Sequence, residues 1–335
     1  MSGTLAGGQV RGEAPAGGET AGGLAGDRLA GDRRAGYRRA TALRLLVRAA
    51  RPRQWPKNVL VFAAPAAAGS LSRPAPVDHA ATAALLFLLA SAGTYLVNDV
   101  VDAPADRAHP TKRRRPVASG ELAPRRALAA GAALAAAALV GAGLLSGPGL
   151  TDVIAAYLAI SVAYTLVLKH VPLVELGCVA SGFVLRAGAG GVADHLALSG
   201  WFLAVACAGA LFVVAGKRSA ELRQLGRTAM AHRLVLGRYR PGLLAALRLA
   251  AGLAAVVAYG LWAFSRAGQL DLHGVDLDDV AFKLSLLPFL LGVLATERAF
   301  EHGEGGAPEE LALHRHDLQL LAGTCVVLVA IGVYA

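Results

Sequence analysis

The stretch LLFLLASAGTYLVNDVVDAPADRAHPTKRRRP, residues 85–116, joins an uncharged apolar run to a dense set of charges of both signs. Residues 85–97 are apolar or small, whereas 98–116 contain three aspartates and five basic residues. Long apolar runs recur along the chain, and roughly 20 apolar residues suffice for a helix to cross a bilayer. The stretch therefore predicts a membrane-spanning helix that ends in a charged rim.

The composition of the whole chain is that of a membrane protein. Its 335 residues are 55% hydrophobic and 17% charged, whereas about a quarter of the residues of a soluble domain are charged. In lipid only helices and closed barrels satisfy the backbone, and the alternating strands of a barrel are absent from the sequence. We predict an all-α fold, a polytopic bundle of about nine transmembrane helices.

Nine candidate spans follow from the apolar runs. They lie at residues 55–72, 79–97, 128–146, 150–168, 172–192, 200–215, 244–265, 282–299 and 318–335. The first is the weakest, because it contains Lys57 and two prolines. Residues 1–40, rich in Gly, Ala and Arg, are expected to form a disordered cytoplasmic tail. Residues 41–335 are expected to form a single transmembrane catalytic domain.

Basic residues are distributed unevenly among the loops. The segments 98–127 and 216–240 each hold seven Lys or Arg, whereas the loops on the other side hold only Arg73 and Arg266. Because Lys and Arg accumulate in cytoplasmic loops, we expect a multi-pass protein of the cell inner (plasma) membrane with both basic segments in the cytoplasm. The net charge of +10 is then explained by topology and anionic ligands rather than by nucleic acid.

The polar motif NDVVDAPAD has the spacing of one helix face. Asn98 and Asp102 are four residues apart, Asp99 and Asp102 three, and Asp102 and Asp106 four, so all four side chains can line one side of a helix. Oxygen-only clusters suit Mg²⁺, which usually joins carboxylates to substrate phosphates. Pro104 is expected to kink or end the helix within this motif. We predict a Mg²⁺ site at Asn98, Asp99, Asp102 and Asp106.

NDVVDAPAD resembles the first aspartate-rich motif of the UbiA-type intramembrane prenyltransferase superfamily. YTLVLK, residues 164–169, is similar to the Tyr/Lys element that ends the fourth helix in that superfamily. The resemblance covers about residues 50–335 and implies nine helices and an active site at the cytoplasmic face. Asp99, Asp102, Lys57, Tyr164 and Lys169 are then the expected catalytic residues. Tyr164 and Lys169 have a second interpretation as interface anchors of a helix end.

The loop GKRSAELRQLGR, residues 216–227, departs from the aromatic prenyltransferases of the superfamily, which carry a second aspartate-rich motif there. Its acidic residue is Glu221, among several cations. Together with RPRQWPKN (51–58) and LRAGAGGVA (185–193), this loop resembles the branch that transfers 5-phosphoribosyl groups to decaprenyl phosphate. That resemblance implies phosphoribosyl diphosphate and a polyprenyl phosphate as substrates, in the synthesis of cell-wall arabinan precursors.

Cations around the motif are expected to hold the phosphates of the substrates. Arg186 is included because a charge inside a membrane span is functional by default. The expected substrate-binding residues are Lys57, Lys112, Arg113, Arg115, Lys169, Arg186, Lys217, Arg218 and Glu221.

Two other functions remain open at this stage. An aromatic prenyltransferase would use a prenyl diphosphate, and the absence of a second aspartate motif argues against it. A transporter or lipid-binding membrane protein would also contain intramembrane charges, although transport sites usually lie near the bilayer midplane. An oligomer is compatible with the sequence.

Overall fold

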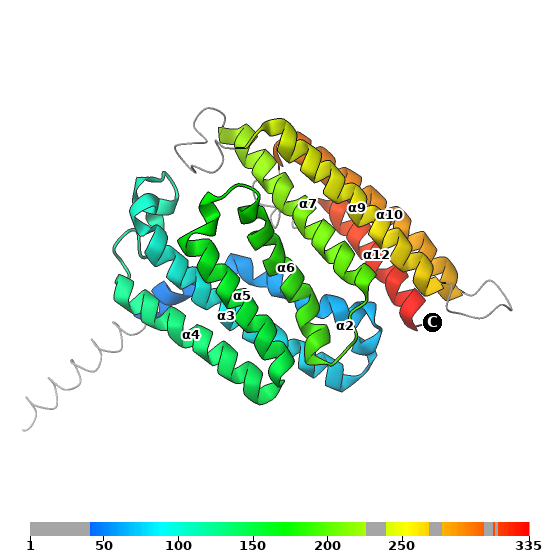
Figure 1. Ribbon diagram of the computed structural model, residues 1–335, viewed down its shortest axis with the longest axis horizontal. Helices are drawn as coiled ribbons and strands as arrows, with labels where there is room; N and C mark the ends of the chain where they lie inside the picture. Colours follow the sequence, from blue (N-terminus) through cyan, green and yellow to red (C-terminus); the bar gives the residue numbers. More distant parts are fainter. Residues whose placement is uncertain (1–40, 226–238, 268–276, 305–310, 312–313, 335) are drawn as a thin grey trace, which may run out of the picture. The chain divides into compact units, whose positions relative to one another are not determined.

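The computed structural model describes residues 41–225, 239–267, 277–304, 311 and 314–334 (Figure 1). Leu45–Ala335 form one compact unit. The tail predicted at residues 1–40 lies outside the described residues. All regular structure in the described ranges is helical, which confirms the all-α prediction.

Eight of the described helices are long and apolar enough to cross a membrane. They are α3 (Pro74–Ala108), α4 (Pro124–Leu145), α5 (Pro148–Leu166), α6 (Val174–Ala193), α7 (Gly200–Leu225), α9 (Pro241–Ala267), α10 (Leu277–Glu301) and α12 (His316–Tyr334). The chain is therefore a multi-pass membrane protein. Each of these helices corresponds to one of the last eight predicted spans, with different end points.

The first predicted span, 55–72, is not one continuous helix. It consists of the 3₁₀ helix η1 (Pro52–Phe62), the short helix α2 (Ala63–Ala67) and the turn η2 (Ser70–Ser72). Pro56 lies inside η1 and Pro65 inside α2, and each proline removes a backbone donor that a continuous α-helix would use. The segment is therefore helical but is not a single α-helix, and it is not among the eight long helices.

Helix α3 is longer than the predicted span 79–97 and includes the whole polar motif. It does not end at Pro104 but continues to Ala108. Pro104 lacks the backbone N–H that would donate one hydrogen bond within the helix. Two residues later, Asp106 Oδ2 accepts a hydrogen bond from Arg115 Nη1 at 2.6 Å, which holds this turn. Asp106 therefore stays on the same helix as Asp99 and Asp102.

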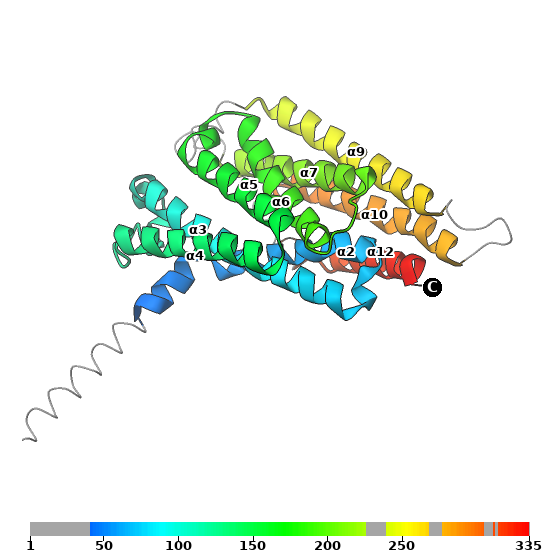
Figure 2. The same ribbon diagram turned by 60° about the horizontal axis from the view of Figure 1, so that its bottom comes forward.

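The helices pack mainly on their neighbours along the chain, α3 with α4, α7 with α9, and α10 with α12. Figures 1 and 2 show α3, α4 and α5 together and α7, α9, α10 and α12 together, with α6 between the two groups. Helix α6 contacts η1, α3, α5 and α7. The segments that carry the sequence motifs thus meet around α6.

Gly190 is the place where α6 and η1 touch most closely. A Cβ atom added there would lie 2.1 Å from the carbonyl oxygen of Val61. We expect Gly190→Ala to push η1 away from α6 and to lower the free energy of unfolding by about 1–3 kcal/mol. Thermal unfolding in detergent measures this loss.

Gly177 offers a matched control on the same helix, because an added Cβ there meets no described atom within 4 Å. Gly177→Ala is expected to leave the unfolding temperature unchanged or slightly raised. Equal unfolding temperatures for both variants would contradict the close packing of η1 on α6.

Candidate active site at the end of helix α3

The three aspartates of the motif lie on α3, each bonded to a cation. Asp99 is 2% exposed and accepts hydrogen bonds from Arg51 and, at 3.4 Å, from Arg115 Nη1. The same Arg115 nitrogen donates to Asp106 Oδ2 at 2.6 Å. Lys169 Nζ donates to Asp102 Oδ1 at 2.5 Å. Oppositely charged groups from four segments of the chain thus converge here.

The motif also meets the end of helix α5. Thr165 Oγ1 donates to Asn98 Oδ1 at 3.4 Å, and Lys169 lies in the short turn η4 (Leu168–His170) that follows α5. The structure therefore brings together the aspartate motif and the segment YTLVLK, which are far apart in the sequence. Tyr164 lies on α5 beside Thr165, near enough to Arg218 for an electrostatic interaction.

Arg51 is a site residue that the sequence did not reveal. It precedes Pro52, has a φ of 55°, and its guanidinium lies 4.9 Å from the centre of the Tyr95 ring while it bonds Asp99. A left-handed backbone is uncommon for arginine and tends to occur where surrounding contacts enforce it. Its only signal was its place as the first residue of RPRQWPKN.

Within the run KRRR, Arg115 forms ion pairs with Asp99 and Asp106. Lys112 and Arg113 belong to the single 3₁₀ turn η3 (Lys112–Arg114), where Arg113 is exposed. Lys57 lies in η1 with its Nζ 5.7 Å from the centre of the Phe183 ring. Arg113 thus lies on the same segment as Arg115, and Lys57 lies on the same segment as Arg51. Both of these arginines bond aspartates of the motif.

A second contact holds the loop after α3 in place. Arg48 donates to the carbonyl oxygen of Arg114 at 2.8 Å and to Glu121 Oε1 at 3.1 Å. The hydrogen bond from Arg48 holds the pKa of the Glu121 carboxyl below its usual range. This contact fixes the backbone next to Arg115.

Arg218 in α7 forms ion pairs with two carboxylates. Its Nε and Nη2 donate to the two oxygens of Glu175 at 2.7 and 2.8 Å, and its Nη1 donates to Glu221 at 2.7 Å. Arg218 and Glu175 are both buried. Bidentate pairing of this kind is the geometry that arginine favours with carboxylates. Arg218 therefore joins α7 to α6 through a fully engaged guanidinium.

Tyr239 extends this network to the loop before α6. Its hydroxyl accepts a hydrogen bond from the Leu173 N–H at 2.9 Å and donates to Glu175 Oε1 at 3.4 Å. Leu173 has a φ of 65°, which costs free energy for a residue with a side chain. Burial raises the pKa of the Tyr239 phenol, which keeps it protonated as a donor. Tyr239, near the end of the basic segment 216–240, is thus bonded to the backbone of Leu173, four residues after Lys169.

Arg186 lies in the interior of the bundle and bonds neutral groups. It donates to Asn58 Oδ1 at 3.0 Å, to the Gly182 carbonyl oxygen at 2.8 Å and to the Tyr157 hydroxyl at 2.8 Å. The Tyr157 ring also lies 4.7 Å from its guanidinium. Through Asn58, Arg186 ties η1 to α6 next to Lys57. No contact between Arg186 and the three aspartates occurs among the described residues.

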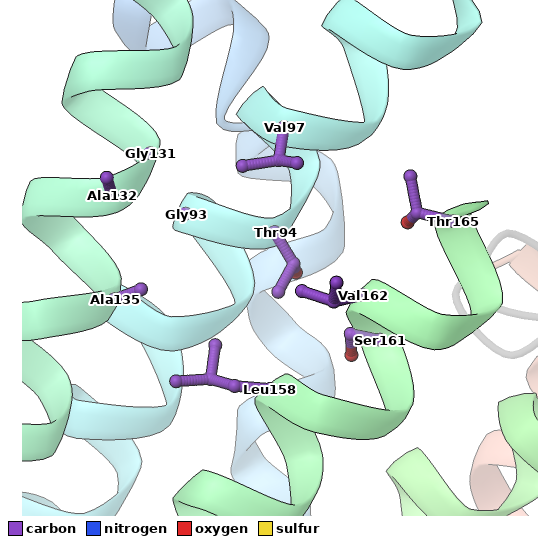
Figure 3. A pocket seen from close by; sticks show the side chains of 10 residues that line it. All are labelled: Gly93, Thr94, Val97, Gly131, Ala132, Ala135, Leu158, Ser161, Val162 and Thr165. Atoms are coloured by element: carbon purple, nitrogen blue, oxygen red, sulfur yellow. The ribbon is translucent and has the colours of Figure 1, made fainter.

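A cavity of about 200 Å³ lies between α3, α4 and α5. Figure 3 shows its lining of small and apolar side chains with a few hydroxyls: Gly93, Thr94, Val97, Gly131, Ala132, Ala135, Leu158, Ser161, Val162 and Thr165. Val97 precedes Asp99 by two residues, which is about 200° around a helix. None of the three aspartates lines the cavity, although Thr165, which donates to Asn98, does.

The donor set of the motif suits a hard divalent cation. Asn98, Asp99, Asp102 and Asp106 offer only oxygen atoms on one stretch of α3, and carboxylate oxygens are preferred ligands of Mg²⁺. In the described part of the chain no three acidic, His or Cys side chains are grouped as ligands, and the motif carboxylates are paired with Arg51, Arg115 and Lys169. The residues fit the ion chemically once they turn from these cations.

These features define an all-helical membrane protein with a cluster of paired charges at the end of α3. Residues 59–273 match the UbiA prenyltransferase family. The chain belongs to the UbiA prenyltransferase family.

Similar proteins extend the comparison over most of the chain. The decaprenyl-phosphate phosphoribosyltransferase of Mycolicibacterium smegmatis is 42% identical over 281 residues, covering 82% of this chain and 88% of that protein. The protein of the same name from Corynebacterium glutamicum is 40% identical over 292 residues, covering 86% of each. A UbiA homologue from Archaeoglobus fulgidus, solved with DMAPP and Mg²⁺, has a TM-score of 0.63 at 17% identity, covering 86% of this chain and 97% of that one. This last likeness shows the fold.

Proposed function

We propose that this chain transfers the 5-phosphoribosyl group of phosphoribosyl diphosphate to a polyprenyl (decaprenyl) phosphate and releases diphosphate. The observation that carries the proposal is the 40–42% identity, over more than four fifths of the chain, to enzymes named decaprenyl-phosphate phosphoribosyltransferase. The charge of the site supports it, because both substrates are phosphorylated and the cations Arg51, Arg115 and Lys169 meet at the aspartate motif.

Mg²⁺ is the proposed cofactor, held by Asp99 and Asp102 with Asn98 and Asp106. When bound it supplies Lewis-acid stabilisation of the leaving diphosphate. The homologue solved with Mg²⁺ and a diphosphate compound supports the use of a divalent metal in this fold.

We assign the predicted substrate-binding residues to two roles. Lys57, Lys112, Arg113, Arg115 and Lys217 are proposed to bind phosphate oxygens of the donor, as point charges or bidentate clamps. Arg218, Glu221 and Arg186 are engaged with protein groups, so we assign them to positioning the loops that bind the substrates. In this assignment Arg218 orients Lys217, its neighbour in α7.

The acceptor needs no general base in this mechanism. The second pKa of a phosphate monoester is about 6, so its oxygen is ionised near neutral pH. As diphosphate departs, C1 of the ribose acquires oxocarbenium character, and an acceptor oxygen attacks it from the opposite face. We assign Lys169, which bonds the motif at Asp102, to the phosphate oxygens of the donor and Tyr164, at the end of α5, to the acceptor phosphate. Positioning and electrostatic stabilisation then supply most of the rate.

The proposed location is the plasma membrane, with the site facing the cytoplasm. The segments 98–127 and 216–240 each hold seven Lys or Arg, and these residues favour the cytoplasmic side of a membrane. We propose that the product serves as a precursor of cell-wall arabinan, which is what the resemblance to the phosphoribosyltransferase branch implies.

The identity of the donor substrate distinguishes this function from that of an aromatic prenyltransferase. Purified protein in lipid nanodiscs is given Mg²⁺, polyprenyl phosphate and either labelled phosphoribosyl diphosphate or a labelled prenyl diphosphate. We expect label to enter the lipid fraction from the sugar donor only. Transfer to an aromatic acceptor from the prenyl donor would replace the proposal, and intact protein that transfers neither would support a transporter or lipid-binding protein.

Lys217→Ala tests the basic segment at the end of α7, which the structure shows to be helical rather than the predicted loop. No ion pair of Lys217 occurs among the residues that the structure describes, and loss of a charged hydrogen bond to substrate costs about 1.5–3 kcal/mol. We expect KM for phosphoribosyl diphosphate to rise at least tenfold, with little change in KM for the lipid. Lys283→Ala, at the exposed Lys283–Asp279 pair of α10, is the control; equal KM values for both variants and the wild type would refute the role of Lys217.

A further inference from the structure

The cations and carboxylates at the end of α3 balance one another. Asp99, Asp102 and Asp106 each accept a bond from Arg51, Arg115 or Lys169. Three negative and three positive charges therefore cancel within this group of six side chains, which we call the motif cluster. A divalent cation that entered the cluster alone would meet three positive side chains at close range, and like charges at this range disfavour one another.

We propose that Arg51, Arg115 and Lys169 occupy the aspartates until a metal–diphosphate complex arrives, and then exchange the carboxylates for phosphate oxygens. The metal takes the carboxylates that the cations release, and the anion takes the cations. This exchange rests on the proposed function for the identity of the anion. Its consequence is that metal and diphosphate bind cooperatively and that neither alone binds tightly.

Arg115 carries the largest share of this exchange. A single nitrogen, Nη1, contacts Asp99 at 3.4 Å and Asp106 at 2.6 Å, so turning the guanidinium away frees Asp106 and leaves Asp99 with Arg51 alone. Phosphate and carboxylate present similar oxygen geometry to arginine. The side chain is 24% exposed, which gives it access to an arriving anion.

Lys169 makes the same exchange at Asp102. Its Nζ lies 2.5 Å from Asp102 Oδ1, and the two side chains are 15% and 26% exposed. Lysine is a compact charge on a flexible stem, so it can follow a phosphate while its turn, η4, stays in place. A partly buried cation that loses its carboxylate needs a new anionic partner, which is why the metal alone cannot displace it cheaply.

Cooperativity of this kind is reciprocal. If diphosphate increases metal affinity by some factor, the metal increases diphosphate affinity by the same factor, commonly 5–150-fold. Removing one of the cations should therefore have opposite effects on the two ligands. Metal affinity without diphosphate rises, whereas diphosphate affinity with metal falls.

The test measures Mn²⁺ binding by electron paramagnetic resonance on the full chain in nanodiscs, with no substrate present. Arg115→Gln and Lys169→Gln are each expected to bind Mn²⁺ about tenfold more tightly than the wild type. Arg114→Gln is the matched control, because it removes the same charge from the same turn and Arg114 makes no ion pair with a described carboxylate. It should stay within about twofold of the wild type.

The second arm measures binding of labelled inorganic diphosphate by equilibrium dialysis, with and without Mn²⁺. Wild-type binding should increase about tenfold with Mn²⁺, and Arg115→Gln should lose most of this gain. Unchanged or weaker Mn²⁺ binding by both Arg115→Gln and Lys169→Gln, with the proteins monodisperse and helical, would overturn the exchange. Neither arm uses phosphoribosyl diphosphate or turnover, so a failure of the donor assignment shows separately in the transfer assay.

Discussion

Replacing Asp102 by asparagine is expected to lower the transfer rate about 10²–10³-fold. Asp102 is the motif carboxylate bonded to Lys169, and it is a proposed ligand of the metal that stabilises the leaving diphosphate. Asparagine has nearly the same shape as aspartate but lacks the negative charge that attracts Lys169 and the metal. Initial rates of labelled phosphoribosyl transfer at saturating Mg²⁺ measure the loss.

Asp78→Asn provides the control on the same helix. Asp78 lies near the start of α3, far along the chain from the motif, and is exposed. Its replacement should leave the rate unchanged. Wild-type rates for Asp102→Asn, with normal amounts of protein in the membrane, would show that the motif does not hold the catalytic metal.

Glu175→Leu is expected to cost about 3 kcal/mol or more in the free energy of unfolding. Glu175 is fully buried and bonds Arg218 through both oxygens, so the substitution leaves a buried guanidinium with one carboxylate, Glu221, in place of two. Denaturant titration in mixed micelles, followed by circular dichroism, measures the change.

Two further variants distinguish the stability contributed by the Glu175–Arg218 ion pair from that contributed by burying the side chains. Glu175→Leu combined with Arg218→Met replaces the ion pair by apolar side chains and should regain part of the lost stability. Glu121→Leu removes an exposed carboxylate that is paired with Arg48 and should produce no measurable shift. A stability loss for Glu175→Leu as small as that for Glu121→Leu would show that the buried network contributes little.

The helices and the motif face could be predicted from the sequence because both depend on local regularities. Apolar length located the eight long helices. The three- and four-residue spacings placed Asp99, Asp102 and Asp106 on one helix, where they converge with cations. The helix does not end at Pro104, and the turn that follows it is bonded from outside by Arg115, a contact that the local sequence does not encode.

The tertiary partners could not be predicted, because spacing along the chain says nothing about pairs that fold together. Arg51 meets Asp99 across 48 residues, and Arg218 meets Glu175 across 43. Tyr239 likewise reaches Leu173 across 66 residues. The sequence therefore identified cations suited to phosphate binding but did not distinguish those engaged by buried carboxylates from those near the motif.

Arg186 illustrates the same limit inside the membrane. An intramembrane charge predicts function, and Arg186 does lie beside the segment that carries Lys57 and Asn58. Its bonds to Tyr157 and to the Gly182 carbonyl, however, are those of a residue that positions a neighbouring segment. Neutral acceptors of this kind come from several helices and leave no pattern in one sequence.

The most direct measurement of the proposed function is the mass of the lipid product. Nanodisc-embedded protein is incubated with phosphoribosyl diphosphate, polyprenyl phosphate and Mg²⁺, and the extracted lipid is analysed by mass spectrometry. We predict a polyprenyl phosphate that has gained one 5-phosphoribosyl group, with diphosphate released in equal amount and no product after chelation of the metal. Unmodified lipid from folded protein, or a product that carries a prenyl group instead, would contradict the proposed reaction.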